Sequence, residues 1–428
     1  MGYWVGKQTI EGAQPTLRLS RGSLVVGIDP VLVLAADLEG RPWRLVDGET
    51  TYRWSLNGSV LAVRRSDEGS RERRRMDPDE ASEVWEATRR RLAPLLEELP
   101  PETGGPGSDP LVDHLLYMAS PTEGPERPPD GAGERLAGAL RRLAATDTES
   151  LREDAARFES VYTPVGILPP DQYMSLVLQL TRGCSFNTCT FCTFYRDFPF
   201  RIKDPEELVT HMQEVEAFLG RGIELRRSIF LGDANALVVP MSRLRPLVEA
   251  VYRRYADHPA SEGGLHAFLD GFSGAKKSAD DYTVLRELGL VRVSVGMESG
   301  HDPLLEWLRK PGTSGDVAAS VRAMKEAGLA VTMIVLLGAG GTRFDEGHVR
   351  DTASLLSSLP LDRGDIVYFS EFVEQPDAPY GVIAAAEQVP PLDRVGMARQ
   401  RERIEAVLEP FREGGPRTAV YDIREFTY

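Results

Sequence analysis

Strand-like and helix-like segments alternate along the second half of the chain, and this pattern restricts the fold more than any other feature. After about residue 160, six short runs have the β-branched and apolar composition of strands. They are 174–180 (MSLVLQL), 228–233 (SIFLGD), 265–271 (LHAFLDG), 291–300 (VRVSVGMESG), 331–341 (VTMIVLLGAGG) and 365–372 (DIVYFSEF). Strand–helix alternation of this kind favours a parallel sheet whose right-handed crossovers place helices on it.

The segments between these runs have helical signals, most clearly at 204–220. Asp204 is placed to cap a helix, Pro205 to open it and Glu207 to complete a capping box. Six units are two fewer than a closed eight-stranded barrel requires. We therefore expect an α/β fold with an open, partial (β/α)6 TIM-like barrel, an N-terminal α+β extension and a small C-terminal appendage.

The remaining sequence suggests further divisions. Turn signals in the first 65 residues favour a small antiparallel meander, and "DPDE" at 77–80 predicts the start of a helix. Pro- and Gly-rich stretches at 100–110 and 120–133 are typical of linkers, and the basic stretch 64–75 is typical of a solvated loop. We predict an accessory region of unknown role at 1–160, the barrel at 161–375 and the appendage at 376–428.

Composition restricts the partners and the compartment. The 428 residues are 42% hydrophobic and 27% charged, and no apolar run reaches the roughly 18 residues needed to span a bilayer. The N-terminal residues lack the pattern of a secretion signal, so we expect a cytoplasmic protein without membrane contact. A formal net charge of −15 makes nucleic acid an unlikely partner, because the surface repels a polyanion.

Cys184, Cys189 and Cys192 are the three cysteines of the chain, and they lie together in "LTRGCSFNTCTFCTFYRDFPFR" at 180–201. This stretch follows the first predicted strand, where parallel α/β folds gather reactive groups. Three thiolates can hold three irons of an iron–sulfur cube and leave the fourth iron open. A zinc site is the alternative, but it needs a fourth ligand, which the nearby sequence does not offer.

The phrase "GCSFNTCTFC" resembles the cluster motif of the radical S-adenosylmethionine (radical SAM) superfamily, with Phe191 in the place of its usual aromatic residue. Four residues instead of the usual three separate the first two cysteines, as in a branch with a "GCSHNxCTFCxMY" type of phrase. The resemblance covers roughly residues 172–375. It implies that the three cysteines bind a [4Fe–4S] cluster and that S-adenosylmethionine (SAM) is the second cofactor.

The resemblance also implies which residues contact SAM. Phe191 lies where the family places a residue against the adenine, and the ends of the second, fourth and fifth predicted strands carry phrases in the places of other SAM-binding motifs. The residues implied by these phrases are Gly232, Asp233, Glu298, Ser299, Ile334, Gly338 and Gly340.

By the same resemblance, the protein is an enzyme that cleaves SAM reductively and takes a hydrogen atom from an unknown small-molecule or carrier-linked substrate. It then needs an external one-electron reductant of the flavodoxin or ferredoxin type. No cysteine remains for a second cluster or as a hydrogen donor, and the Asp-x-His-x-x-Gly phrase of cobalamin-binding domains is missing. The alternatives are an iron–sulfur electron-transfer or sensor protein and a zinc-stabilised binding protein.

No catalytic residue is assigned by the sequence, but several polar side chains near the predicted strand ends are candidates for substrate or cofactor contacts. Each also has a structural interpretation, such as a core histidine, an exposed loop lysine or a packed tyrosine ring. Tyr195 and Tyr368 are candidates to relay a hydrogen atom. The other candidates are Arg196, His266, Asp270, Lys276, Lys277 and His348.

Overall fold

The computed structural model describes residues 3–7, 16–20, 22–28, 31–65, 71–97, 132–273 and 276–428. The chain divides into two compact units, and each is described by itself. The N-terminal unit comprises residues 1–163, 214–226 and 427–428, and the barrel unit comprises residues 164–213 and 227–426.

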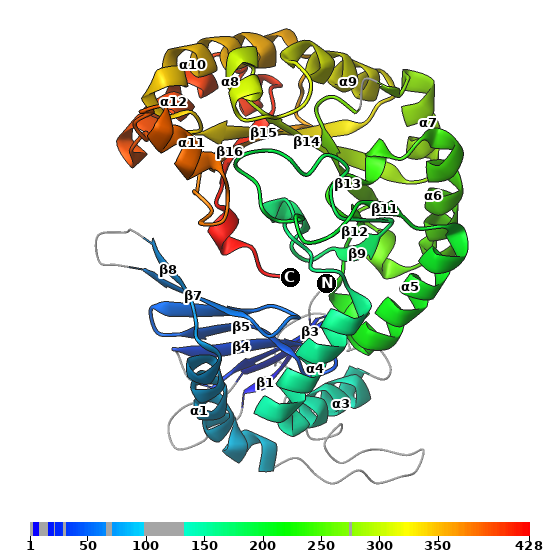
Figure 1. The fold of residues 1–428 in the computed structure, drawn as a ribbon. Helices are drawn as coiled ribbons and strands as arrows, with labels where there is room; N and C mark the ends of the chain where they lie inside the picture. Colours follow the sequence, from blue (N-terminus) through cyan, green and yellow to red (C-terminus); the bar gives the residue numbers. More distant parts are fainter. Residues whose placement is uncertain are drawn as a thin grey trace. The chain divides into compact units, whose positions relative to one another are not determined.

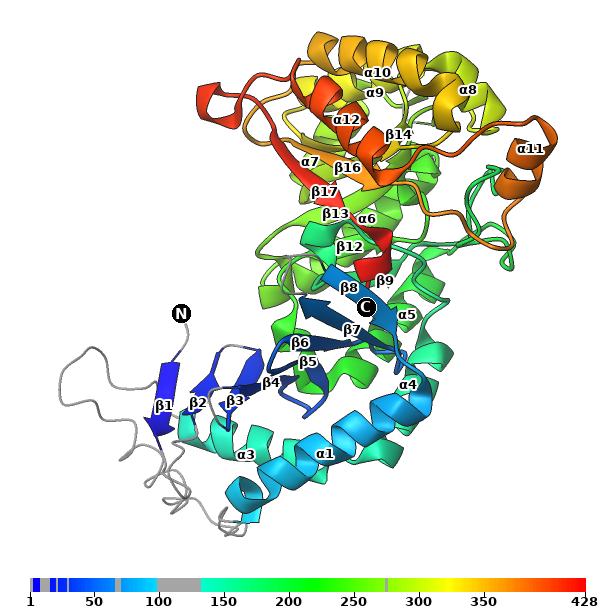
Figure 2. The same ribbon diagram turned by 90° about the vertical axis from the view of Figure 1, so that its left-hand side faces the viewer.

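The N-terminal unit contains an antiparallel sheet in which eight strands follow one another in chain order (Figure 2). Its strands are β1 (Tyr3–Lys7), β2 (Thr16–Leu19), β3 (Ser23–Gly27), β4 (Leu32–Asp37), β5 (Pro42–Asp47), β6 (Thr50–Trp54), β7 (Val60–Arg65) and β8 (Arg71–Arg75). Helices α1 (Pro78–Glu97), α3 (Ala132–Ala145) and α4 (Thr148–Val161) follow.

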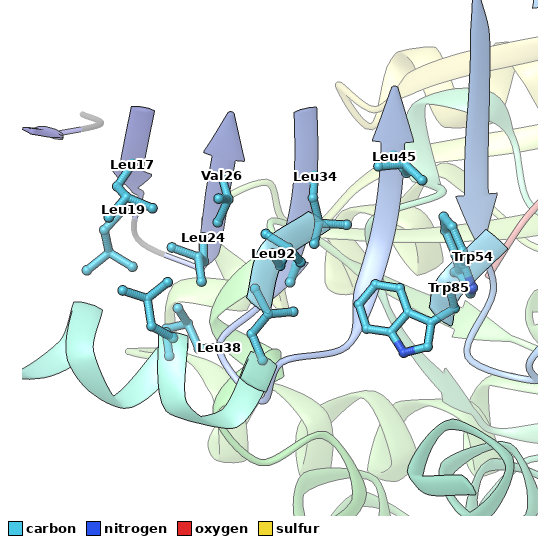
Figure 3. Packing of buried hydrophobic residues seen from close by; sticks show 14 of the residues in the cluster. Leu17, Leu19, Leu24, Val26, Leu34, Leu38, Leu45, Trp54, Trp85 and Leu92 are labelled. Carbon is cyan, nitrogen blue, oxygen red and sulfur yellow. The ribbon is translucent and has the colours of Figure 1, made fainter. Parts of the chain in front are cut away.

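Alternate residues of the strands form the core of this unit together with α1 and α3 (Figure 3). Leu24 and Leu34 are fully buried there, and Trp54 meets Trp85 of α1 edge-on with ring centroids 6.1 Å apart. A strand presents every second side chain to one face, so one face of the sheet supplies the apolar surface that the helices cover.

The meander expected in this region is confirmed, and it extends beyond residue 65. Arg71–Arg75, expected in a solvated loop, instead forms β8, which pairs with β7 at the end of the sheet. A ladder uses backbone groups, and charged side chains are common on the last strand of a sheet. The expected linkers lie outside the described residues except at 132–133, where α3 begins.

The barrel unit contains a parallel sheet of seven strands in the order β9, β12, β13, β14, β15, β16, β17. They span Leu176–Gln179, Ile229–Gly232, Leu265–Asp270, Leu290–Glu298, Ala330–Leu337, Ile366–Glu371 and Arg417–Tyr421, respectively. Figure 1 shows α5 (Pro205–Leu219), α6 (Met241–Tyr255), α7 (Ala279–Glu287), α9 (Ser314–Glu326) and α10 (Gly341–Ser358) on the outside of the curved sheet.

The six expected strands are all present, and so is the predicted α5. Asp204 and Glu207 exchange the hydrogen bonds of a capping box, each 2.9 Å long. The sheet is one strand wider than expected, since the predicted appendage contributes β17, which pairs in parallel with β16. Helices α8 (Asp302–Trp307), α11 (Tyr380–Ala386) and α12 (Arg394–Glu405) complete the unit.

Among the described residues, no helix has both the length and the apolar character needed to cross a bilayer.

Arg41 joins several parts of the N-terminal unit through its buried guanidinium. Its guanidinium lies 2.5 Å from Asp154 and 3.3 Å from Asp37, and it donates to the carbonyl oxygen of Phe218 at 2.7 Å. Burial raises the pKa of Asp37 even though the Arg41 charge opposes this effect. Loss of the arginine therefore leaves a buried carboxylate without its compensating charge.

We predict that Arg41→Met lowers the free energy of unfolding by about 3–5 kcal/mol, because one partner of a buried ion pair is removed. Chemical denaturation of the purified protein measures this change. The control is Arg74→Met, since Arg74 pairs with Glu80 but has a side chain that is 58% exposed. Equal losses in the two variants would contradict a structural role for the buried position.

Candidate functional site

A cavity of about 210 Å³ lies in the barrel unit, and the side chains of Cys184, Cys189 and Cys192 line it. Its walls come from the carboxyl ends of β13 to β17 and from the loops that follow the strands. Aromatic rings form much of the lining: Phe186, Phe191, Phe194, Tyr195, Phe268, Phe272, Phe372 and Tyr421. A largely apolar cavity at the carboxyl ends of parallel strands is the usual place for a ligand in such folds.

The loop that carries the cysteines is closed at its base by a short antiparallel pair, β10 (Thr181–Arg182) with β11 (Arg201–Ile202). Gly183 opens the loop with φ +72°, and a Cβ added there would lie 2.5 Å from the carbonyl oxygen of Phe198. Glycine is therefore the residue type that this turn accepts. The amide of Gly183 donates to the carboxylate of Asp233 at 3.2 Å, which ties the loop to the end of β12.

Two further contacts fix the middle of the loop. Arg196 donates to the carbonyl oxygens of Cys189 at 3.0 Å and Asp377 at 3.3 Å. Thr190 donates through its amide to the carbonyl oxygen of Leu308 at 2.9 Å and accepts from the amide of Tyr380 at 3.1 Å. The backbone around Cys189 is thus held from both sides by the segments that contain α8 and α11.

The environment of the cysteines disfavours negative charge. Burial raises the pKa of Cys189 to about 12, and it also raises the pKa of Cys192. Thiolates at these positions need positive charge close by.

Lys310 supplies one such charge. Its ammonium lies 3.0 Å from the carboxylate of Glu298, and both side chains are 12% exposed. Burial by itself lowers the pKa of Lys310, but the charges of Glu298, Cys189 and Asp270 outweigh burial and raise it.

The backbone around Glu298 is shaped for this ion pair. Glu298 ends β14 with φ +58°, an unfavourable value for a residue with a side chain. At Gly296, a Cβ would come within 3.0 Å of the Glu298 carboxylate and 3.3 Å of the Lys310 ammonium. A glycine at position 296 therefore leaves the space that the pair occupies.

Asn235 and Asp270 form a second polar group in the cavity lining. The Asn235 amide donates to Asp270, whose carboxylate also accepts from the backbone and the hydroxyl of Ser273 at 2.6 and 2.9 Å. The side-chain oxygen of Asn235 is buried and has no hydrogen-bond partner among the residues that the structure describes. A buried acceptor of this kind is available to a donor group of a ligand.

The structure brings part of the predicted set together. Phe191, Glu298 and Ile334 line the same cavity as the three cysteines. Phe191 also packs against the apolar cluster that contains Leu336 and Tyr380.

The other predicted SAM contacts, Gly232, Asp233, Ser299, Gly338 and Gly340, are not among the lining residues. Asp233 braces the cysteine loop, and burial raises its pKa to about 7. A Cβ at Gly338 would meet the Met397 sulfur at 2.7 Å, and one at Gly340 would meet Leu304 at 2.5 Å. Both glycines therefore permit close packing of neighbouring elements.

The histidine and lysine candidates lie away from the cavity lining. His348 is fully buried at 2.8 Å from the Ser299 hydroxyl, and His266 lies 3.0 Å from the carbonyl oxygen of Gly263. Lys277 donates to the carbonyl oxygens of Leu237 and Val239, and Lys276 lies over the Phe272 ring. Asp270 and Tyr195 do line the cavity. Arg196 is not among the lining residues but donates to the backbone of Cys189 in the cysteine loop.

Comparison with known proteins agrees with this geometry. The model of the Radical SAM superfamily matches residues 178–356. This part of the chain is a radical SAM domain. Enzymes of this superfamily use a [4Fe–4S] cluster and SAM, so membership implies both cofactors.

Individual relatives of the radical SAM domain are distant. An anaerobic magnesium-protoporphyrin IX monomethyl ester cyclase of Cereibacter sphaeroides is 24% identical over 170 residues, which are 39% of this chain and 25% of that protein. The match thus spans about a quarter of the length of this curated relative.

Solved structures match at low identity and with TM-scores below 0.5. The methyltransferase TsrM of Kitasatospora setae, with cobalamin and a [4Fe–4S] cluster bound, is 19% identical with a TM-score of 0.39, covering 53% of this chain and 41% of its own. SuiB of Streptococcus suis is 11% identical with a TM-score of 0.38, covering 87% and 71%.

The residues of the radical SAM domain fit the cluster that the family implies. Among the described residues, no three His, Cys, Asp or Glu side chains converge closely enough to hold a single metal ion. A cube of iron and sulfide holds its three cysteines farther apart than a single zinc ion does. Iron also supplies the positive charge that the buried thiols lack.

Lys310, Asn235 and Gly296 were missed by sequence reasoning. Lys310 lies 12 residues after Glu298, beyond α8, and a single lysine in a loop has no distinguishing pattern. The alternation of side chains along a strand could have identified Gly296. Residues 296 and 298 are two apart and lie on the same face as each other, whereas Ser299 follows on the other face. Asn235 lies in the noted phrase "LGDAN", two residues after the Asp233 that we selected.

We predict that His348 makes the protein less stable at acid pH. Burial lowers the pKa of His348 to about 4, so its neutral form is favoured in the folded state. The neutral His348 contributes about 3 kcal/mol to the free energy of unfolding. This contribution is fully present above about pH 6.5 and is lost as the pH falls to about 4. Denaturation of the wild-type protein and His348→Asn across this range measures it. Parallel pH curves would contradict the prediction.

Proposed function

We propose that the protein is a radical SAM enzyme that uses one [4Fe–4S] cluster on Cys184, Cys189 and Cys192 to cleave SAM reductively. Cys184, Cys189 and Cys192 would hold the cluster, which would supply the electron for cleaving the sulfonium of SAM to a 5′-deoxyadenosyl radical that abstracts a hydrogen atom from the substrate. The observation that supports this most is that the three cysteines of a radical SAM domain line a single cavity at the ends of the strands.

Side chains of this chain bind and orient SAM in the proposal. Phe191 and Ile334 present apolar surface to the adenine. The Lys310 ammonium, held by Glu298, is the cation for the methionine carboxylate, and the free oxygen of Asn235 accepts a hydrogen bond from a SAM hydroxyl or amine. Aromatic rings around these groups exclude water and strengthen each charge interaction.

The substrate is a small molecule or a carrier-linked group with apolar character. Phe186 and Phe272 meet edge-on at the cavity with ring centroids 6.1 Å apart, and the Phe186 side chain is partly exposed. Among the relatives, the cyclase is named for a porphyrin ester and TsrM has been solved with tryptophan, both of which contain aromatic rings. A flavodoxin- or ferredoxin-type protein is the proposed electron donor.

We also propose that residues 161–375 carry the chemistry, with 1–160 as an accessory region and 376–428 as a C-terminal addition. In this proposal, the predicted SAM contacts outside the cavity lining support the residues that form it. These are Gly232, Asp233, Ser299, Gly338 and Gly340.

We predict that serine at any one of the three cysteine positions abolishes SAM cleavage. Serine oxygen is a poor substitute for a thiolate in binding iron, so the absorbance of the reconstituted cluster also falls to background. Anaerobic reconstitution followed by measurement of 5′-deoxyadenosine detects both effects. Thr188→Ser is the control, because Thr188 is exposed and lies in the same loop.

The outcomes separate the alternatives. A cluster without SAM-dependent 5′-deoxyadenosine would favour an electron-transfer or sensor protein. A colourless protein that retains zinc would favour a zinc-stabilised binding protein.

We predict that Lys310→Met weakens SAM binding at least tenfold, about 1.4 kcal/mol, because it removes a buried cation and leaves Glu298 without its partner. Calorimetry on the reconstituted protein measures the affinity, and cluster absorbance confirms that iron loading is unchanged. The exposed neighbour Arg309 provides the control as Arg309→Gln. If affinity is lost only together with the cluster, Lys310 acts on the cysteines and not on SAM.

A further inference from the structure

Two tyrosine rings lie against each other, and one of them lines the cavity. Tyr421 lines the cavity, and its ring lies 5.7 Å from the ring of Tyr368, centroid to centroid. The hydroxyl of Tyr368 donates to the carboxylate of Asp171 at 3.1 Å, and that of Tyr421 donates to the carbonyl oxygen of Leu168 at 2.7 Å. The rings are 3% and 5% exposed, whereas Asp171 is exposed to solvent.

A substrate that has lost a hydrogen atom holds an unpaired electron. Where the product has a new C–H bond, a hydrogen-atom donor must quench that radical, and the exchange of one hydrogen atom for another leaves the oxidation level of the substrate unchanged, as in an epimerisation or a rearrangement. Thiols are good hydrogen-atom donors, but the chain has three cysteines and all three are assigned to the cluster. A phenol is the remaining donor in the cavity lining, since its O–H bond is weaker than most alkyl C–H bonds.

Tyr195 also lines the cavity, but the structure gives it no equivalent support. Its ring contact is with Phe194, at 6.4 Å between centroids, and among the described residues it has no ring contact with a tyrosine. Its hydroxyl has no hydrogen-bonded acceptor among those residues either. A radical formed on Tyr195 therefore lacks the direct ring contact to a carboxylate-linked tyrosine that Tyr421 has.

We propose that Tyr421 donates a hydrogen atom to the substrate radical and that Tyr368, with Asp171, restores Tyr421. This inference rests on the proposed function. The Tyr421 O–H bond breaks as a substrate C–H bond forms, which leaves a phenoxyl radical on Tyr421.

One electron from the external iron–sulfur or flavin reductant, passed through the Tyr368 ring, and one proton from water restore the phenol. While Tyr368 is oxidised, Asp171 holds its proton and then returns it. Restoring Tyr421 thus consumes one electron and one proton for each hydrogen atom that it donates, in addition to the electron that cleaves SAM. Because Asp171 is exposed, it exchanges protons with solvent.

The test needs no substrate. The reconstituted full chain is given SAM and a reductant in deuterated water, where phenol hydrogens exchange and carbon-bound hydrogens do not. We expect 5′-deoxyadenosine to carry one deuterium in the wild type, and the labelled fraction to fall at least tenfold in Tyr421→Phe. Tyr195→Phe should keep the label.

The outcomes are distinguishable by mass spectrometry. Unlabelled product from the wild type, label that persists in Tyr421→Phe, or label lost in Tyr195→Phe would overturn the inference and leave the proposed function intact. Failure of the wild type to form any 5′-deoxyadenosine would overturn the proposed function itself.

A second measurement covers the case in which Tyr421→Phe folds poorly, since that change leaves the Leu168 carbonyl without its donor. Fluorotyrosine at position 421 keeps the hydroxyl and adds a fluorine splitting to the electron paramagnetic resonance signal of a tyrosyl radical. We expect this splitting after SAM cleavage, and a longer-lived radical in Tyr368→Phe and Asp171→Asn. A tyrosyl signal without fluorine splitting would contradict the assignment.

Discussion

The site depends on the balance of charge inside a cavity with mostly apolar walls. Negative charge on Cys189 and Cys192 is unfavourable there, because burial raises the pKa of both thiols. Lys310 supplies one positive charge but shares it with Glu298 at 3.0 Å. Further positive charge is needed before three thiolates can exist together, and iron is the ion that this family uses to provide it.

Several distant segments hold the charged groups in place. The cysteine loop is anchored at its base by Asp233 and in its middle by Arg196 and Thr190, so its position depends on β12, α8 and the segment before α11. Each anchor is a hydrogen bond to backbone. A loop held in this way keeps its cysteines fixed while the side chains facing the cavity remain available to ligands.

Local sequence signals were sufficient for most of the fold. The capping box at Asp204 and Glu207 placed α5, and six β-branched runs located six of the seven strands, because these signals act over a few residues. The seventh strand, β17, lies in the predicted appendage and was not expected in the sheet. Pairing with β16 is a long-range contact, and nothing in the local sequence of β17 specifies its partner.

The candidate site, like the fold, has some features that local sequence predicts and others that depend on long-range contacts. By itself, the sequence selected the three cysteines, Phe191, Glu298 and Ile334 as candidates, since a motif and strand ends mark them, and all six line one cavity. Only the tertiary structure decided that Lys310 meets Glu298, that Gly338 faces Met397, and that the Tyr421 ring lies against the Tyr368 ring. Periodicity and spacing describe neighbours along a chain, whereas these contacts join side chains from separate strands and loops that only the curvature of the sheet brings together.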